Sequence, residues 1–289
     1  MAFSVQLGLV LAVLTAFGSV AGFLYKFRGA RVAPAVDLRR PLRSSVELFR
    51  SPLYSLGILI ALASWGLHVG ALALAPISLV QSVIAGGLVL LTVVADRLFG
   101  IAVSRREWIG VGLTAAGLAF LAATLGHGAR ATYAHYAPGR LALYLSLLAA
   151  AGLALAAASR RAESLAVSAG LLWAASDTSI KALSSHLHAL GIGVLLHPLS
   201  FVILVASLVG LLVSARSLQL GDAVPVIALT SAAANLTTIA AGPIVFGEPL
   251  PSGQGALALH VLAFLLVVVA AALTPPPLAS AAPGVADHG

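Results

Sequence analysis

The chain has 289 residues, of which 60% are hydrophobic and 9% are charged. Soluble domains carry about 45–50% apolar and about 25% charged residues, so this composition excludes a water-soluble fold of this length. A net charge of +7 would suit a nucleic-acid-binding protein, but the charges lie between long apolar runs and indicate a membrane instead.

Uninterrupted apolar runs predict transmembrane helices, because a helix crosses the hydrocarbon core in about 20 residues and satisfies its own backbone there. The first run, residues 1–25, lacks charge and lacks the basic start of a signal peptide, which predicts a retained span. Residues 51–95 are also free of charge, and their length, with Pro76 inside, predicts two spans. The whole chain is predicted to be an all-α polytopic transmembrane helix bundle with about nine spans, near residues 3–24, 53–73, 77–97, 107–125, 140–159, 164–183, 194–215, 222–246 and 254–274.

The basic residues predict the orientation of these spans. Thirteen of the 16 Lys and Arg residues fall in loops that share one side of a nine-span arrangement, and residues 25–52 alone hold seven of them. Short cytoplasmic loops are enriched in Lys and Arg, which predicts a multi-pass protein of the cytoplasmic membrane with its N-terminus outside and its C-terminus inside. The basic loop 25–52 is interpreted as a topology anchor, with binding of anionic lipid headgroups as the alternative. Residues 275–289, rich in Pro, Ala and Ser, are predicted to be a disordered cytoplasmic tail.

An internal repeat organises the spans. Adding 147 to the residue numbers lays Ala85–Gly87 on Ala232–Ala234 and Phe99-Gly100 on Phe246-Gly247. In looser register, the first and sixth spans are both apolar helices with a lysine near the end, Lys26 and Lys181. Equivalent helices are five crossings apart, an odd number, so the second copy is predicted to be inverted relative to the first.

This 4 + 1 + 4 pattern predicts the domain organisation. The predicted parts are a first repeat at residues 1–139, a connecting span at 140–159 and a second, inverted repeat at 160–274. Inverted-topology repeats are typical of secondary transporters, in which two quasi-equivalent halves exchange inward-open and outward-open shapes about a site at the midplane.

Three segments carry a resemblance to a known family: Gly70–Ile84, with the sequence Gly-Ala-Leu-Ala-Leu-Ala-Pro-Ile-Ser-Leu-Val-Gln-Ser-Val-Ile, the loop Phe99–Gly110, and the turn Phe246-Gly-Glu-Pro-Leu. Together they resemble the drug/metabolite transporter superfamily, in its EamA-like branch, and the nine-span plan is similar to that of the NIPA-type magnesium transporters. The resemblance implies a helix-bundle transporter. Ile101 stands where the family pattern has Glu, and nine spans replace the commoner ten, so the resemblance implies no particular substrate.

Asp177 is the clearest candidate for a functional residue. It lies about two thirds of the way along the span 164–183, and ionisable groups at membrane depth are costly and usually face a cavity or a partner. Lys181 follows four residues later on the same helical face. One interpretation is that Asp177 binds a proton, a cation or an amine while Lys181 keeps it ionised. The other is a structural ion pair near the outer interface, with Lys181 extending outward.

Other polar and aromatic residues could share a cavity with Asp177 if the spans converge. Tryptophan rings offer flat walls for apolar or cationic solutes, and amides and imidazoles offer hydrogen bonds. The candidates are Trp65, His68, Gln81, Trp173 and Asn235. For each one alone, ordinary packing or a hydrogen bond between helices is the competing interpretation.

Histidines gather in the loops that are predicted to lie outside, and they were considered as metal ligands or pH sensors. No two of them have a firm chelating spacing within one helix, so no metal site is predicted. These residues are His127, His135, His186, His188 and His197.

The leading functional prediction is a secondary, non-ATP transporter that moves a small solute or metabolite by alternating access. The chain shows no P-loop, no HExxH and no GxSxG pattern, and it has no cysteine, so neither ATP use, nor an enzyme activity, nor a cofactor is predicted. The alternatives are a Mg²⁺ permease or channel and a lipid or prenyl-phosphate translocase. Mg²⁺ needs several oxygen ligands, whereas Asp177 is the one acid deep within a predicted span. The expected partners are membrane lipid, a small-molecule or ion substrate and, left open, a second copy in a homodimer; nucleic acid is not expected.

Overall fold

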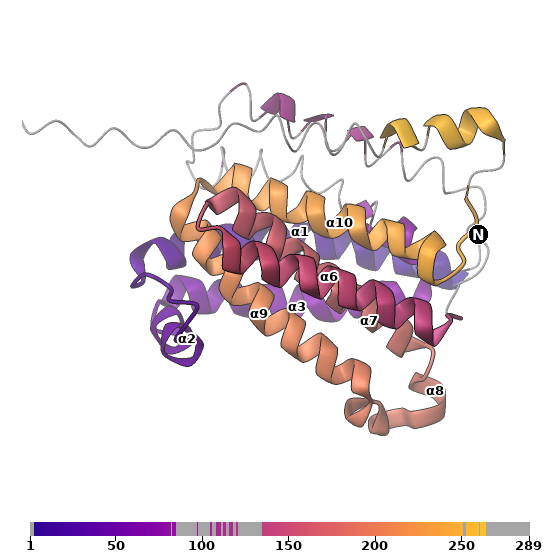
Figure 1. The fold of residues 1–289 in the computed structure, drawn as a ribbon, viewed down its shortest axis with the longest axis horizontal. Helices are drawn as coiled ribbons and strands as arrows, with labels where there is room; N and C mark the ends of the chain where they lie inside the picture. The colour runs from indigo at the N-terminus through magenta and orange to yellow at the C-terminus, as the bar shows by residue number, and fades with distance from the viewer. Residues whose placement is uncertain are drawn as a thin grey trace, which may run out of the picture.

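The structure is a computed structural model, and Figure 1 shows its fold. It describes residues 3–81, 83, 84, 97, 105, 108–110, 112, 113, 116, 117, 120, 135–250, 253–259 and 261–263. These residues form helices, turns and bends without a β-strand among them, so the all-α prediction is confirmed for this part of the chain. The helices are α1 (Phe3–Val32), α2 (Pro41–Phe49), α3 (Pro52–Leu74), α6 (Pro138–Ala158), α7 (Ala162–Ser184), α8 (Leu187–Leu190), the 3₁₀ helix η2 (Gly191–Leu196), α9 (Pro198–Leu220) and α10 (Ala223–Val245).

Prolines set the beginnings of several helices. A proline in the first helical turn loses no hydrogen bond, because the amide groups there have no partner within the helix. α3 begins at Pro52, after Ser51, whose hydroxyl accepts a hydrogen bond from the amide of Tyr54. α9 begins at Pro198, after His197, whose Nδ1 accepts one from the amide of Leu199 at 3.2 Å. The same proline effect moves the start of α9 four residues beyond the predicted start of that span.

Consecutive long helices alternate in direction, so that α1, α6 and α9 run one way and α3, α7 and α10 run the other. Ser217 near the end of α9 donates a hydrogen bond to the carbonyl of Ala162 at the start of α7, at 2.7 Å. Ser168 of α7 donates to the carbonyl of Gly152 of α6, also at 2.7 Å. This alternation is what successive membrane crossings require.

The closest helix pairs are α1 with α3 and α7 with α9. In the first pair, Thr15 and Ser64 donate to each other's backbone carbonyls at 3.5 and 3.4 Å. In the second, the hydroxyl groups of Ser176 and Ser207 lie 3.0 Å apart and share a hydrogen bond. In lipid the hydrophobic effect does not drive helices together. Small residues that allow close packing, and hydrogen bonds from hydroxyl groups to the neighbouring helix, hold them together instead.

Five helices within the described residues are long and apolar enough to cross a membrane: α1, α3, α6, α9 and α10. They fit a multi-pass membrane protein. α7 is as long as α3 but contains Asp177 and Lys181, and it is not among the five. The predicted spans 77–97, 107–125 and 254–274 fall wholly or mostly outside the described residues, as does the tail 275–289, so the count of nine remains a prediction.

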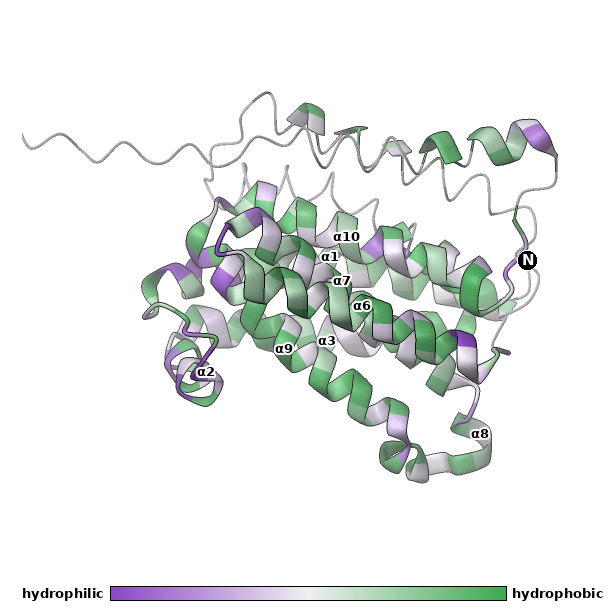
Figure 2. Cartoon of the chain, in the orientation of Figure 1, coloured by the Kyte–Doolittle hydropathy of each residue, from purple (hydrophilic) through white to green (hydrophobic). Residues whose placement is uncertain are grey.

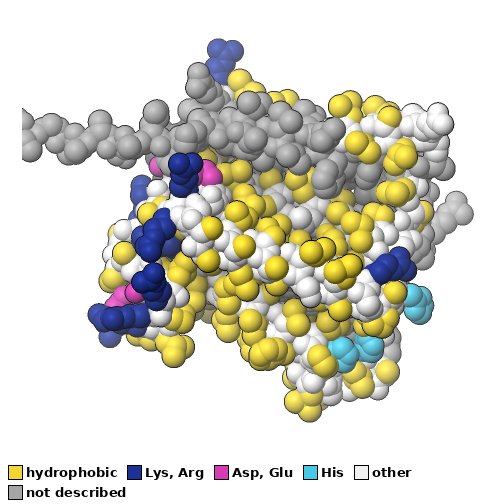
Figure 3. Space-filling view, in the orientation of Figure 1, with side chains coloured by type: hydrophobic (Ala, Val, Ile, Leu, Met, Phe, Trp, Pro, Cys, Tyr) yellow, Lys and Arg dark blue, Asp and Glu magenta, His cyan; other side chains and the backbone are white. Residues whose placement is uncertain are grey.

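The outside of the bundle is apolar over the length of its helices (Figures 2 and 3). Leu59, Leu143 and Phe201 are between 62% and 69% exposed, whereas the interior holds small and hydroxyl residues such as Ser168, which is completely buried. A water-soluble bundle would show the opposite distribution. The apolar surface is therefore consistent with contact to lipid chains.

Figure 3 shows most of the visible Lys and Arg side chains at one end of the bundle and His side chains at the other, where Arg140 at the start of α6 also lies. We call these the basic end, where α1 ends and α3 begins, and the histidine end, where α3 ends and α6 begins. At the basic end, the side-chain amide of Gln219 links α9 to the end of α1 and to the loop that follows it. Its Oε1 accepts from the amide of Val36 at 2.8 Å, and its Nε2 donates to the carbonyls of Ala30 and Pro34 at 3.1 and 2.9 Å.

Candidate functional site

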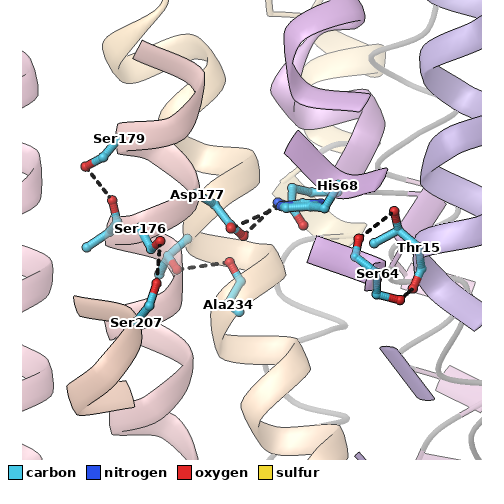
Figure 4. A network of polar contacts seen from close by, with 11 residues as sticks. Thr15, Ser64, His68, Ser176, Asp177, Ser179, Ser207 and Ala234 are labelled. Atoms are coloured by element: carbon cyan, nitrogen blue, oxygen red, sulfur yellow. Dashed lines mark hydrogen bonds and ion pairs between the residues drawn. The ribbon is translucent and has the colours of Figure 1, made fainter. Parts of the chain in front are cut away.

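Asp177 of α7 lies at the centre of a polar cluster that joins three segments. Its Oδ1 is 3.0 Å from Nε2 of His68 on α3, and its Oδ2 accepts a hydrogen bond of 3.0 Å from Nε2 of Gln81. Gln81 comes from the helical residues 77–81 that follow the turn after α3. Figure 4 shows Asp177 pointing toward His68 across the boundary between α7 and α3. Each carboxylate oxygen thus has one donor from another segment.

The protonation of His68 follows from this geometry. An ionised carboxylate only accepts hydrogen bonds, so Nε2 of His68 must carry a proton when Asp177 is charged. The other ring nitrogen, Nδ1, is buried and has no hydrogen-bond partner among the residues that the structure describes. His68 can therefore be either a neutral Nε2–H donor or an imidazolium paired with Asp177.

Asp177 retains an open side that its partners lack. His68 and Gln81 are 7% and 2% exposed, while the side chain of Asp177 is 17% exposed. Trp173, one turn earlier on α7, is also only partly buried, although Ala174, Ala175 and Ser176 between them are buried. Trp173 and Asp177 are therefore the partly exposed residues on this part of α7, and they lie on the same face of the helix.

Lys181 does not pair with Asp177, which corrects the prediction made from their spacing. The side chain of Lys181 is completely buried, and its Nζ donates to the carbonyls of Leu72 and Ala75 at 2.8 and 2.7 Å. These carbonyls belong to the C-terminal end of α3, where the last four carbonyls of a helix lack intrahelical partners and the helix dipole is negative. The lysine stem reaches this end of α3 and does not extend outward, because the acceptors are there.

Glu248 is a functional-site candidate that the sequence showed only as part of the turn Phe246-Gly-Glu-Pro-Leu. It follows the turn at Gly247, where φ is +65°, and it is 5% exposed. Its Oε1 accepts from the amide of Ile77 at 2.8 Å, and its Oε2 accepts from the amide of Ser78 at 3.4 Å and from the Ser78 hydroxyl. A carboxylate at the N-terminal end of a helix is stabilised by the free amide groups there.

Lys181 and Glu248 therefore bind opposite sides of the same turn. Lys181 binds the end of α3, and Glu248 binds the beginning of the helix that follows. Burial raises the pKa of Glu248, while the bonds from Ser78 and Ile77 and the charge of Lys181 oppose that rise. No local sequence signal could have found this contact, because Ile77 and Glu248 are 171 positions apart. The contact becomes visible only when α7 and α10 pack beside α3.

The remaining predicted site residues lie in three different environments. Trp173 packs edge-on against Phe23 of α1, with ring centroids 5.4 Å apart. Trp65 is 45% exposed on α3, unlike His68 one turn later, so these two side chains do not share the interior. Asn235 is buried on α10 and forms no hydrogen bond with the Asp177 cluster among the described residues. Of the five residues expected beside Asp177, the structure brings His68 and Gln81 into contact with it.

A second buried lysine lies near Trp173. Lys26 of α1 is 5% exposed, and its Nζ lies 4.1 Å from the ring centroid of Phe23 and 5.5 Å from that of Trp173. The sequence reasoning used Lys26 only as a marker of the repeat. The signal that could have singled it out is its position six residues before the end of a 30-residue apolar helix.

The histidines at the histidine end are held by local contacts. The rings of His186 and His197 have centroids 5.0 Å apart, and Nδ1 of His186 lies 3.0 Å from the hydroxyl of Ser185. Within the described residues there is no group of three or more side chains that could hold a metal ion. His127 and the side chain of His188 lie outside the described part of the chain.

Comparison with known proteins gives no relative from which a role could be transferred. No protein-family model, no curated protein and no solved structure matches the chain.

Proposed function

We propose that the protein is a secondary transporter that moves a small solute across the cytoplasmic membrane by alternating access. The observation that carries the proposal is the Asp177 carboxylate. It is bound at once by His68 of α3 and by Gln81, yet its side chain is 17% exposed on a helix most of whose residues are buried. An intramembrane ionisable group in such a position is a functional-site hypothesis by default.

The arrangement of the helices supports two quasi-equivalent halves. α1 packs most closely with α3, and α7 with α9, and further contacts join α1 to α9 and α3 to α7. An inverted repeat would relate α1 to α7 and α3 to α9. If the members of each of these pairs exchange places, the same set of helix contacts results. We therefore propose the inverted repeat, the nine spans and membership of the drug/metabolite transporter superfamily as parts of the same hypothesis.

The distribution of charge supports a cytoplasmic basic end. Arg31, Arg160, Arg161 and Arg216 all lie at helix ends on that side. Under the positive-inside rule, a cytoplasmic basic end would put the N-terminus outside, and we propose this orientation.

The Asp177 cluster would couple the two halves to one another. Its hydrogen bonds cross from α7 in the second half to α3 and residues 77–81 in the first. Protonation of Asp177, or a substrate that competes for its oxygens, would weaken these bonds and so favour separation of the halves on one side. A ligand shifts such an equilibrium only by its differential affinity for the two states, and an ionised carboxylate with two donors offers that difference.

The test is solute uptake into liposomes that contain the purified protein, with and without a pH gradient, for the wild type and for Asp177→Asn. We expect the substitution to abolish gradient-driven uptake, a loss of at least about tenfold, or ~1.4 kcal/mol in the barrier. Asn keeps the size of the side chain, so the protein should still fold.

Glu163→Gln provides the matched control, since Glu163 is a partly buried acid in the first turn of the same helix. It should leave uptake unchanged. Uptake at the wild-type rate in Asp177→Asn would remove this residue from the mechanism. Mg²⁺ flux that ignores the pH gradient would favour a permease instead, and scrambling of labelled lipid would favour a translocase.

A further inference from the structure

The ammonium group of Lys26 is buried in the bundle without an acceptor among the described residues. No described residue offers its Nζ a hydrogen bond or an ion pair, and its neighbours are the faces of Phe23 and Trp173. A buried charge is normally paired, because removal from water is costly. Cation–π contacts offset part of that cost but leave the three N–H donors unused.

The fold directs this ammonium group inward. Phe23 is one turn nearer the N-terminus of α1, so Nζ points away from the basic end, and Trp173 is at the middle of α7. Helical side chains lean toward the N-terminus of their helix. Gly57 of α3 makes room for the lysine stem, since a Cβ at that position would lie 2.9 Å from Cγ of Lys26.

We infer that Lys26, Phe23 and Trp173 form a binding site for a small organic anion, a monovalent carboxylate with an aromatic or apolar body. One ammonium group balances one negative charge, which favours a carboxylate over a doubly charged phosphate. The rings of Phe23 and Trp173 give the body of such an anion flat, apolar walls. The inference rests on the proposed function in one respect, namely that this carboxylate is the transported substrate.

The neighbouring Asp177 cluster argues for an anion and against a cationic solute. Both oxygens of Asp177 already have donors in His68 and Gln81, whereas Lys26 has no acceptor within the part of the chain that the structure describes. Between these two groups, the one without an oppositely charged or hydrogen-bonding partner is therefore the cation. Trp173 lies one turn before Asp177 on α7, so the anion would bind one helical turn from the Asp177 cluster.

The test uses Trp173 as its own reporter. Trp65 and Trp108 are 45% and 38% exposed, and their replacement by Phe leaves Trp173 as the single tryptophan. In this background, para-bromobenzoate should quench the fluorescence of the detergent-purified protein through its bromine atom, and para-bromobenzylamine, of the same size and opposite charge, should not. Lys26→Met should raise the Kd for para-bromobenzoate at least about tenfold, while Lys26→Arg should keep it within about threefold.

Arg160→Met is the matched control, because it removes one positive charge from an exposed position. It should leave the Kd unchanged. Thermal unfolding of each variant checks that Lys26→Met is folded. The anion site would be refuted by equal Kd values in Lys26→Met and the wild type, by equal quenching from the amine, or by no quenching from the carboxylate.

Uptake of labelled para-bromobenzoate into liposomes separates this inference from the proposed function. Lys26-dependent binding without uptake would count against the transporter and leave the anion site standing. Uptake that saturates at the same concentration in Lys26→Met and the wild type would overturn the anion site and leave the transporter standing.

Discussion

Two buried lysines lie near the C-terminal ends of α1 and α7, yet their surroundings differ. Lys181 donates to two backbone carbonyls at the end of α3 and lies near the carboxylate of Glu248. Lys26 lies against two aromatic rings and has no acceptor among the described residues. Burial of an ammonium group thus does not by itself distinguish a structural role from a binding role; its acceptors do.

The position of α3 explains the difference. Lys181 meets its C-terminal end, where carbonyls lack partners in the helix, whereas Lys26 lies against Gly57 within the helix, where each carbonyl is already bonded to a later amide. One lysine therefore completes the hydrogen bonds of the fold. The other remains able to accept an external anion.

The largest expected effect is that of Lys181→Met on stability. The substitution leaves two buried carbonyls unpaired, which should lower the free energy of unfolding by about 2–5 kcal/mol. Lys26→Met, the matched control, should lower it little or raise it, since it removes a buried charge that has no hydrogen-bond or ion-pair partner among the described residues. Thermal or denaturant unfolding in one detergent compares the two. Equal losses of stability would show that the two lysines do not differ in the way proposed.

Glu248→Gln should have a smaller effect, about 1–2 kcal/mol. Glutamine can still accept from the amide of Ile77, but it replaces the second oxygen, which Ser78 contacts, with a donor, and it removes the charge near Lys181. Glu163→Gln again serves as the control and should change stability by less than about 0.5 kcal/mol. Combination of Glu248→Gln with Lys181→Met should cost less than the sum of the single effects. Additive losses would mean that the two groups act independently.

Much of the helix arrangement could be predicted from the sequence, because apolar length and proline position act locally. The predicted spans 53–73, 140–159 and 164–183 agree to within two residues with α3, α6 and α7. α1 was predicted to end at residue 24 but continues to Val32, so that Lys26 lies within the helix. The short α2 within the basic loop was not predicted, since its nine residues cannot span a membrane.

The candidate site was predictable only in part. Asp177 was found because a carboxylate stands out in an apolar helix, and His68 and Gln81 were among its expected neighbours. The predicted pairing of Asp177 with Lys181 was wrong. A spacing of four residues shows that the two side chains can meet, but it does not show that the carbonyls of Leu72 and Ala75 lie within reach of the lysine. The contact of Glu248 with Ile77 and the position of Lys26 against Trp173 depend on the packing of segments that are distant in sequence.

The smallest expected effect comes from Gly210→Ala, which changes the surroundings of Lys26 without touching its charge. A Cβ at Gly210 of α9 would lie 2.7 Å from Nε1 of Trp173, so the indole ring must shift. Alanine favours a helix over glycine by about 0.5–1 kcal/mol, which should offset the strain and leave stability nearly unchanged. The Kd for para-bromobenzoate should rise about threefold, and the emission maximum of Trp173 should move. Gly66→Ala on α3, where nothing lies within 4 Å of the added Cβ, should change neither. If Gly210→Ala leaves both quantities unchanged, Trp173 is not a wall of the anion site, and the contrast between Lys26 and Lys181 would depend on hydrogen-bond acceptors alone.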